Sequence, residues 1–275
     1  MSVQARIAAK KHLGQNFLTN KQMQAKIAAT MATLVHQYPN LPVVEVGPGR
    51  GDLTRYFVEF DHPFHAIEID PDLEPTLIEQ FSAKSNFHLH IADFVDVLPE
   101  LSEKMLSNQP SNFILLSNLP FNVGSRILVD LALYAPQAPF GIILQKEVCD
   151  KLSSTSNFTL FGSFLSLFWN FQQKFSIAPN NFYPQPNVQS ALVLAQPHAT
   201  LPHFLQSVEQ RQKVLELFKI LFSQPSKTLW NNLKLSPLSK EQMEELYQAQ
   251  NWPQTLRLGW DNYQHILVAI LEKLS

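Results

Sequence analysis

The segment 117–122 reads Ser-Asn-Leu-Pro-Phe-Asn and combines side chains suited to chemistry on an aromatic amine. The amino group of adenine is a weak nucleophile because its lone pair is delocalised into the ring. The side-chain oxygen of Asn118 and a neighbouring backbone carbonyl can accept its two hydrogens and direct the lone pair towards an activated methyl group. Phe121 can stack on the base. We therefore predict that Asn118, Leu119, Pro120 and Phe121 form a catalytic motif, although an ordinary strand-to-turn junction would use the same residue types.

A glycine-rich loop with Gly47, Gly49 and Gly51 follows the apolar run 43–46. Glycine lets a ligand approach the backbone closely because it has no Cβ atom. A dinucleotide-binding loop would carry its third glycine at position 52, which is Asp52, and the Gly-Lys-Ser/Thr of a P-loop does not follow either. The Asp52 carboxylate would also repel a pyrophosphate. The loop therefore favours a nucleoside without phosphates that carries a positive charge, such as S-adenosylmethionine.

Two acidic residues end the next two apolar runs. Glu68 lies about 20 residues after Gly47, where a doubly wound fold places the acid that accepts both ribose hydroxyls. Asp93 follows the run 87–91 and can accept a hydrogen bond from the adenine amino group. Either acid alone is compatible with a solvated strand end. In this order, and together with the loop and Asn118, they predict one cofactor site at the carboxyl edge of a sheet.

Short apolar runs alternate with stretches of helical spacing over the first two thirds of the chain. This alternation is typical of a parallel, doubly wound α/β sheet. Asn20 is predicted to cap a helix that extends to about His36. The predicted parallel strands are 42–46, 64–69, 87–91, 113–118 and 140–145, and the runs 164–168 and 190–195 are predicted to add an antiparallel edge.

Beyond a linker at 197–202, the apolar residues recur only at helical spacing. We therefore predict two domains. Residues 1–196 contain the sheet and a basic N-terminal arm, and residues 202–275 form a smaller, all-helical domain.

The net charge of −2 is low for a nucleic-acid-binding protein, which is commonly basic. The charges are unevenly distributed, because residues 1–44 contain lysine and arginine but no acid, whereas acids gather between 45 and 103. We expect Lys10 and Lys11 of the basic arm to contact nucleic-acid phosphate, with a merely solvated arm as the alternative.

The cellular setting predicted from the sequence is the cytoplasm. No apolar run approaches the roughly 20 residues of a membrane span, and no apolar core of a signal peptide follows the polar N-terminus. Cys149 is the single cysteine, so an internal disulfide cannot form and a cysteine-based metal site is not expected.

These motifs resemble the rRNA adenine dimethyltransferase family, and within it the bacterial branch that dimethylates two adjacent adenines near the 3′ end of 16S rRNA. The resemblance covers almost the whole chain. Most relatives carry tyrosine at the position of Phe121, so stacking is preserved and a hydroxyl is lost. The resemblance rests on Lys-Lys-His-Leu-Gly-Gln-Asn-Phe-Leu at 10–18, the Gly47 loop, Glu68, Asp93, Asn-Leu-Pro-Phe at 118–121, Gln-Lys-Glu-Val at 145–148, and Phe-Tyr-Pro-Gln-Pro-Asn-Val-Gln-Ser-Ala at 182–191.

The resemblance implies a class I (Rossmann-like) methyltransferase sheet with a smaller all-helical C-terminal domain, and S-adenosylmethionine as cofactor without a metal. It implies that Phe182 flanks the target base opposite Phe121. The expected partner is 16S rRNA in a pre-30S small ribosomal subunit, bound in part through Lys10 and Lys11, and the enzyme is expected to be a monomer. The positions implied to contact the cofactor are Asn16, Leu18, Gly47, Glu68, Asp93 and Asn118.

Three alternatives stay open at this point. An enzyme of the same chemistry could act on large-subunit rRNA. A ribosome assembly factor could retain the fold without turnover, which the low positive charge favours and the intact Asn118 motif disfavours. A protein glutamine methyltransferase uses a similar Asn-Pro motif but is expected to lack the Gly-Gln-Asn-Phe segment at 14–17.

Overall fold

A computed structural model describes residues 9–101, 112–153 and 158–274, except for the side chains of Lys11 and Ser153. The chain divides into two compact units. The N-terminal unit comprises Met1–Ser153 and Phe168–His198, and the C-terminal unit comprises Ser154–Leu167 and Ala199–Ser275.

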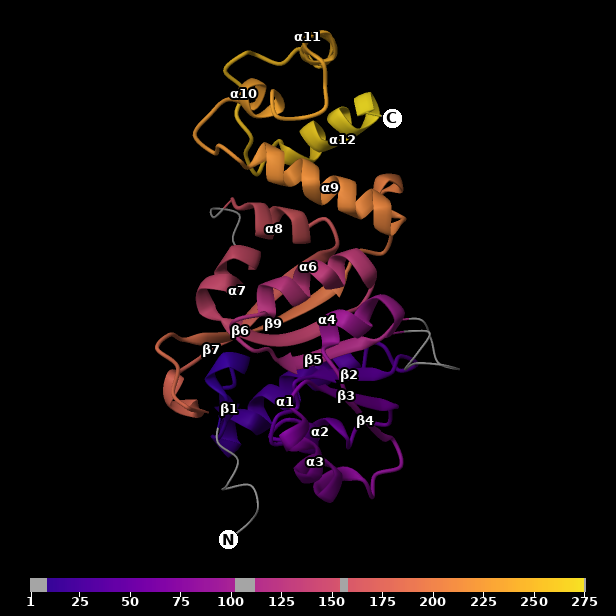
Figure 1. Ribbon diagram of the computed structural model, residues 1–275, viewed down its shortest axis with the longest axis vertical. Coiled ribbons are helices and arrows are strands. Elements are labelled where there is room, and N and C mark those ends of the chain that lie inside the picture. The colour runs from indigo at the N-terminus through magenta and orange to yellow at the C-terminus, as the bar shows by residue number, and fades with distance from the viewer. Residues whose placement is uncertain (1–8, 102–111, 154–157, 275) are drawn as a thin grey trace. The chain divides into compact units, whose positions relative to one another are not determined.

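The described residues of the N-terminal unit form a seven-stranded sheet in the order β4-β3-β2-β5-β6-β9-β7 (Figure 1). Neighbouring strands from β4 to β6 are parallel, and β9 is antiparallel to both β6 and β7. The five predicted parallel strands and the predicted antiparallel run at 190–195 are thus confirmed. The strands of this sheet are β2 (Val43–Val46), β3 (Phe64–Glu68), β4 (Phe87–Ile91), β5 (Ile114–Asn118), β6 (Phe140–Gln145), β7 (Trp169–Ile177) and β9 (Ser190–Pro197).

The strand order places four predicted site segments at one edge. The chain runs from β2 outwards through β3 and β4 and then returns to β5 on the other side of β2. In such a sheet, a crevice opens at the carboxyl ends of the strands where the order reverses. The glycine loop follows β2, Glu68 ends β3, Asp93 follows β4 and Asn118 ends β5, so all four segments reach this crevice.

Helices cover both faces of the sheet, with α1, α2 and α3 on one face and α4 and α6 on the other (Figure 1). Helix α1 begins after Asn20, whose side chain accepts a hydrogen bond from the Met23 N–H at 3.1 Å, and this confirms the predicted cap. Ile27, Met31 and Leu34 form its buried stripe. The helices of this unit are α1 (Lys21–Val35), α2 (Thr54–Phe57), α3 (Glu74–Phe81), α4 (Phe94–Val97), α6 (Gly124–Tyr134) and α7 (Lys146–Ser153).

A second, two-stranded sheet joins segments far apart in the chain. Strand β1 (Phe17–Leu18) pairs antiparallel with β8 (Phe182–Tyr183), with Phe17 opposite Tyr183 and Leu18 opposite Phe182. This pairing holds the segment before α1 beside the loop between β7 and β9.

The prediction of a strand at 164–168 is wrong. Residues Leu160–Leu165 form helix α8, in which the Thr159 hydroxyl caps the N-terminus by accepting a hydrogen bond from Gly162 N–H, and the strand begins only at Trp169. Phe164 is fully buried, and its ring meets that of Phe218 at a centroid distance of 5.8 Å. A short apolar run does not by itself distinguish a buried helix from a buried strand.

The C-terminal unit is helical in its described residues, and it includes α8. This segment lies within 1–196 in the predicted division but within the C-terminal unit here. Aromatic packing explains why, since the ring of Phe158 lies 4.8 Å from that of Phe222 and 5.7 Å from that of Tyr263. The other helices of this unit are α9 (Val208–Leu221), α10 (Leu229–Leu233), α11 (Lys240–Ala249) and α12 (Tyr263–Leu274).

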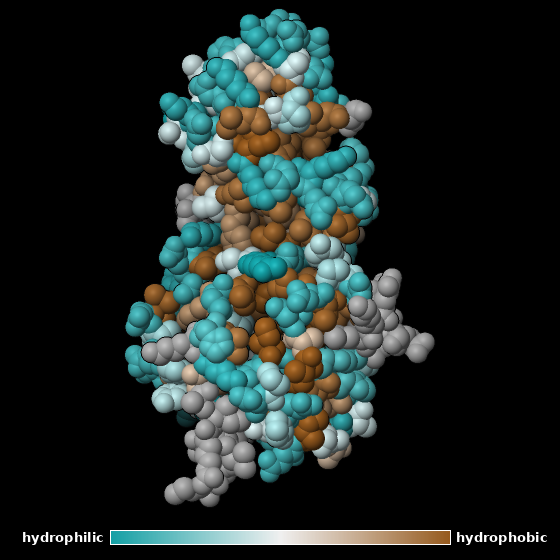
Figure 2. All heavy atoms as spheres, viewed as in Figure 1, coloured by the Kyte–Doolittle hydropathy of each residue, from teal (hydrophilic) through white to brown (hydrophobic). Residues whose placement is uncertain are grey.

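Hydrophilic and hydrophobic residues are interspersed over the visible face of each unit (Figure 2). Large apolar side chains that are well exposed include Tyr183 at 60% and Leu235 at 55%. Within the described part of the chain, no helix combines the length and the apolar character that crossing a membrane requires.

Candidate active site

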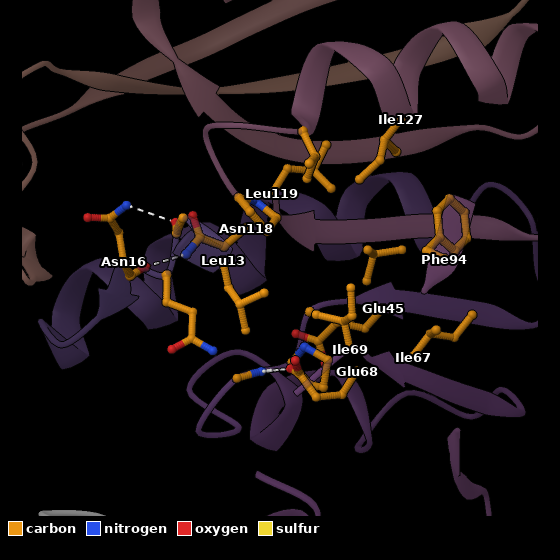
Figure 3. A pocket seen from close by; sticks show the side chains of 18 of the residues that line it. Leu13, Asn16, Glu45, Ile67, Glu68, Ile69, Phe94, Asn118, Leu119 and Ile127 are labelled. Atoms are coloured by element: carbon orange, nitrogen blue, oxygen red, sulfur yellow. Dashed lines mark hydrogen bonds between the residues drawn. The ribbon is translucent and has the colours of Figure 1, made fainter. Parts of the chain in front are cut away.

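A cavity opens at the carboxyl edge of β2, β3, β4 and β5, and Figure 3 shows Asn16, Glu68 and Asn118 around it. The four residues of the predicted catalytic motif at 118–121 line this cavity. This motif lies close to the loops that follow β2, β3 and β4 because parallel strands end at the same edge of the sheet. The six residues predicted to contact the cofactor also line it, namely Asn16, Leu18, Gly47, Glu68, Asp93 and Asn118.

Glu68 connects the glycine loop to the end of β3. Gly47 and Gly49 adopt φ values of 64° and 61°, in the left-handed region that glycine occupies without strain. The Gly49 N–H donates to Glu68 Oε2 at 3.0 Å, and the Asp70 N–H donates to Oε1 at 2.9 Å. Burial raises the pKa of Glu68, and these two backbone hydrogen bonds oppose that rise. The loop and the predicted ribose-binding carboxylate therefore form one hydrogen-bonded unit.

Glu45 is a cavity residue that the sequence analysis missed. It is only 2% exposed, and the Thr54 hydroxyl donates to its Oε2 at 2.6 Å. Burial raises the pKa of Glu45 to about 8, and the charges of Glu68 and Asp52 add to the rise. The available signal was a lone charged residue inside the fully buried strand Val43–Val46, since a buried charge needs a specific partner.

Among the charged residues that line the cavity, acidic side chains outnumber basic ones. Glu45, Asp52, Glu68 and Asp93 line it, whereas the described lining residues include one basic side chain, Arg126. The Nε atom of Arg126 lies 3.5 Å from a carboxylate oxygen of its neighbour Asp130. Those of these acidic side chains that are ionised repel phosphate groups and attract a cation. The residues present thus fit S-adenosylmethionine, which is a nucleoside with a positively charged sulfonium.

A hydrogen bond holds one end of the Asn118 side-chain amide in place. Its Nδ2 donates to the Asn16 carbonyl oxygen at 2.9 Å, as the dashed line in Figure 3 shows. Its Oδ1 is buried and accepts no hydrogen bond from any residue that the structure describes. A buried acceptor without a partner is costly. A ligand with an N–H group at this position would satisfy it.

The remaining motif residues differ in burial. Leu119 is 1% exposed, whereas Pro120 and Phe121 are half-buried. Phe121 therefore offers part of its ring to the cavity that it lines. Its stacking on a base stays a prediction.

Asp93 lines the cavity and also caps helix α4. Its Oδ1 accepts a hydrogen bond from the Val95 N–H at 2.9 Å. This contact orients the carboxyl group at the end of β4. Its hydrogen bond to an adenine amino group stays a prediction.

Lys10 has acidic partners in the structure. Its Nζ lies 2.6 Å from Asp70 Oδ1 and 2.6 Å from Asp72 Oδ2, and Gln15 Nε2 donates to Asp70 Oδ2 at 3.0 Å. Burial alone would raise the pKa of Asp70, but the hydrogen bonds from Lys10 and Gln15 outweigh it and the pKa is lowered. The prediction that Lys10 binds RNA phosphate therefore competes with an ion pair that the structure already forms. The side chain of Lys11 lies outside the described residues.

The segment 10–18, which we call the N-terminal strap, is hydrogen-bonded at both sides of the cavity. On one side Lys10 and Gln15 hold Asp70. On the other side Asn118 Nδ2 donates to the strap at Asn16, and Asn122 Nδ2 donates to the His12 carbonyl oxygen at 3.2 Å. The strap therefore connects the end of β3 with the end of β5 and supplies part of the cavity wall.

Phe121 is among the described residues that line the cavity, whereas Phe182 is not. Phe182 is 3% exposed and packs in the core with Leu18 and Ile177. That it flanks the target base opposite Phe121 stays a prediction. Since side chains alternate along a strand, burial of Phe182 in β8 turns its neighbour Tyr183 outwards.

A family model described as "Ribosomal RNA adenine dimethylase" matches residues 6–252 of the chain. The "Ribosomal RNA small subunit methyltransferase A" of Lactococcus lactis subsp. lactis is 34% identical over 257 residues, which cover 90% of this chain and 84% of that protein. The protein of the same name from Pseudomonas fluorescens is 31% identical over 239 residues, which cover 85% of this chain and 84% of that protein.

Two crystal structures share the fold. The 23S rRNA methyltransferase ErmE matches with a TM-score of 0.64 and 23% identity, over 94% of this chain and 99% of that chain. A dimethyladenosine transferase from Plasmodium falciparum matches with a TM-score of 0.62 and 17% identity, over 94% of this chain and 90% of that chain. With the family match over residues 6–252, the chain belongs to the ribosomal RNA adenine dimethylase family of S-adenosylmethionine-dependent methyltransferases.

Proposed function

We propose that this enzyme methylates the 6-amino groups of two adjacent adenines near the 3′ end of 16S rRNA, in a precursor of the small ribosomal subunit. The relatives named as small subunit methyltransferases support this target, because they are 31% and 34% identical over 84% of their own length. The likeness to ErmE, at 23% identity, concerns the fold alone.

The observation that carries the proposed chemistry is the buried Oδ1 atom of Asn118, which has no partner among the described residues. The hydrogen bond from Nδ2 to Asn16 prevents the amide from turning over, so Oδ1 stays available as an acceptor. When Oδ1 accepts a hydrogen bond from the adenine amino group, the lone pair of the nitrogen is less delocalised into the ring. When bound, S-adenosylmethionine supplies a methyl group that is already activated.

Positioning then provides most of the rate enhancement. The backbone carbonyl groups beside Asn118 can accept the second amino hydrogen, and the half-buried ring of Phe121 can hold the plane of the base. Buried Leu119 lines the cavity, and its N–H donates to the Ile143 carbonyl oxygen at 3.2 Å.

Labelled methyl transfer tests the target. Undermethylated small subunits, large subunits and free 16S rRNA are offered to the enzyme, and the labelled nucleotides are mapped. We expect label on two adjacent adenines of the small-subunit rRNA. Label on large subunits alone would assign the enzyme to the other ribosomal RNA, and intact cofactor binding without any methyl transfer would make the protein an assembly factor.

Replacing Lys10 with alanine is expected to weaken cofactor binding several-fold. The strap would lose its ion pairs to Asp70 and Asp72 and hold the cavity wall less firmly. Lys21→Ala is the matched control, because it removes the same charge from the same acid-free stretch without touching Asp70. Calorimetry with S-adenosylmethionine measures both variants. Equal affinities for Lys10→Ala and wild type would show that the ion pair does not support the site.

Cofactor affinity is expected to rise with pH through Glu45. Glu45 has a pKa of about 8 and is therefore mostly protonated at neutral pH. A cationic ligand favours the carboxylate and lowers this pKa, so binding releases a proton below about pH 8. The dissociation constant should fall as the pH rises towards about 8 and level off above it.

Calorimetry at several pH values, repeated in buffers of different ionisation enthalpy, measures this proton release. The Glu45→Gln variant is the control, since it keeps the size of the side chain and cannot titrate. Its affinity should change less with pH than that of the wild type. Identical pH profiles for the two proteins would contradict a role for Glu45.

A further inference from the structure

Two stretches of the chain, 1–44 and 151–208, contain none of the 23 acidic residues. The fold brings them together in the N-terminal unit. The Thr19 N–H donates to the Asn181 carbonyl oxygen at 2.8 Å, and Leu18 pairs with Phe182. Further along α1, the Lys26 ammonium lies 4.0 Å from the ring centroid of Phe175. A surface without its own carboxylates therefore forms where α1 meets β7 and β8.

Three lysines on this surface have no carboxylate partner among the described residues. Lys21 and Lys26 are exposed on α1, and Lys174 on β7 is half-buried. Two of them contact neutral groups, since Lys26 lies over the Phe175 ring and Lys174 donates to the Gln172 side-chain oxygen. In contrast, other lysines of this unit form ion pairs, including Lys10, Lys84, Lys146 and Lys151.

Acidic residues that lie near α1 and β7 on neighbouring elements already have basic partners. Gln24 of α1 donates to Asp52 at 3.2 Å, and Asp52 lies 3.6 Å from Arg55. Helix α7, which packs against β7 and β9, carries two acids and two lysines. They pair within the helix, since Lys146 lies 2.7 Å from Asp150 and Lys151 lies 2.9 Å from Glu147. The three unpaired lysines therefore leave a net positive field.

This surface is continuous with the wall of the active site. Phe17 and Leu18 line the cavity, and both pair with β8. Tyr183, opposite Phe17, is 60% exposed. In Figure 1, β1 in indigo lies close to the segment that follows β7. A strand of nucleic acid that entered the cavity could thus pass from Tyr183 to the lysines of α1.

We propose that Lys21, Lys26, Lys174 and Tyr183, the acid-free face, bind the RNA backbone and one unpaired base beside the target adenine. This proposal rests on the proposed function in its choice of RNA as partner. Unpaired lysines suit phosphate contacts, and an exposed aromatic ring suits base stacking. The arrangement also reconciles RNA binding with a net charge of −2, because the acids lie elsewhere.

Lys174 could instead have a structural role in the sheet. It lies at the register shift between Gln173 and Phe175 in β7, the edge strand of the sheet. Lysines and bulges at an edge strand prevent pairing with another sheet. That role would account for Lys174 and would leave RNA affinity independent of it.

The salt dependence of RNA binding tests the proposal. Lys21, Lys26 and Lys174 are replaced together by alanine. The matched control replaces Lys84, Lys219 and Lys240, which lose the same charge but each lie beside a carboxylate. The slope of log affinity against log salt should fall in magnitude by about 2 to 3 for the first triple variant, as expected for three phosphate contacts. The control should keep the wild-type slope, and both variants should bind S-adenosylmethionine normally.

Two hairpins of equal length serve as probes, one from the 3′ end of 16S rRNA and one of unrelated sequence. Because counterion release does not depend on sequence, the change in slope should appear with both. The acid-free face is thus tested even if methyl-transfer mapping assigns the enzyme to a different RNA. Equal slopes for the two triple variants would overturn the proposal.

Tyr183 provides an independent measurement. Tyr183→Ala should weaken binding of single-stranded RNA by roughly tenfold without changing the salt slope, and Tyr183→Phe should restore it, since stacking needs the ring alone. Unchanged affinity for Tyr183→Ala would remove Tyr183 from the face. If the lysines instead supported binding to vesicles containing phosphatidylserine and not to RNA, the face would belong to a membrane contact and the proposal would be wrong.

Discussion

Replacing Asn118 with alanine is expected to slow methyl transfer by about 100- to 1000-fold, the usual effect of removing one aligned polar contact at a reaction centre. The substitution removes the buried Oδ1 acceptor and adds no bulk or charge. Cofactor affinity should change much less, because Gly47, Glu68 and Asp93 remain in the cavity wall. Single-turnover methylation of small subunits, measured beside cofactor binding, separates the two effects.

The same substitution also removes the hydrogen bond from Nδ2 to Asn16, so a general loss of stability must be distinguished from a loss of chemistry. Asn112→Ala is a suitable control. Asn112 lies just before the same strand, at the end away from the cavity, and its side chain donates to the Gln137 carbonyl oxygen at 2.7 Å. We expect near-normal turnover for this variant. Near-normal turnover of Asn118→Ala would refute the proposed role of Oδ1.

Glu68→Ala is expected to weaken S-adenosylmethionine binding by at least tenfold. In the proposed site the carboxylate accepts two ribose hydroxyls, and charge-assisted hydrogen bonds contribute roughly 1.5–3 kcal/mol each. The structure adds a second cause, because the Gly49 N–H would lose its acceptor and the glycine loop its connection to β3. Both effects act on binding before any methyl group is transferred.

Glu68→Gln separates these causes, since it keeps the length of the side chain and replaces one acceptor oxygen by a donor. Its affinity should lie between those of wild type and Glu68→Ala. Thermal unfolding checks that both variants fold. Calorimetry that gave the wild-type affinity for a folded Glu68→Ala protein would remove Glu68 from the cofactor site.

Most of the sheet could be predicted from the sequence because several local signals indicate each strand. Each parallel strand is a short apolar run followed by a polar or glycine residue, and the helix after Asn20 has both a cap and a buried stripe. The positions of Gly47, Glu68 and Asn118 around one cavity then follow from strand ends meeting at one edge. Their roles in binding were inferred from residue type and family resemblance.

Other features depended on contacts that the sequence does not encode locally. Lys10 was predicted to contact phosphate from charge alone, but its ion pair to Asp70 joins positions 60 residues apart. Phe182 belongs to a motif shared with the family, yet its burial depends on β8 pairing with β1. Glu45 was not predicted because the valines around it in β2 indicate a core strand and give no sign of the cavity.

Helix α8 lies between two strands of the N-terminal unit in sequence and belongs to the C-terminal unit in space. During synthesis, α8 leaves the ribosome before α9 and α12, which carry the aromatic residues that cover it. The contacts of Phe158 with Tyr263 and of Phe164 with Phe218 therefore form only after these later segments have emerged. A chain ending at His198 would lack Phe218 and Tyr263, which pack against Phe164 and Phe158, and would be prone to aggregate. The C-terminal unit can thus be completed only after α12 has been made, although its first helix precedes β7 in the chain.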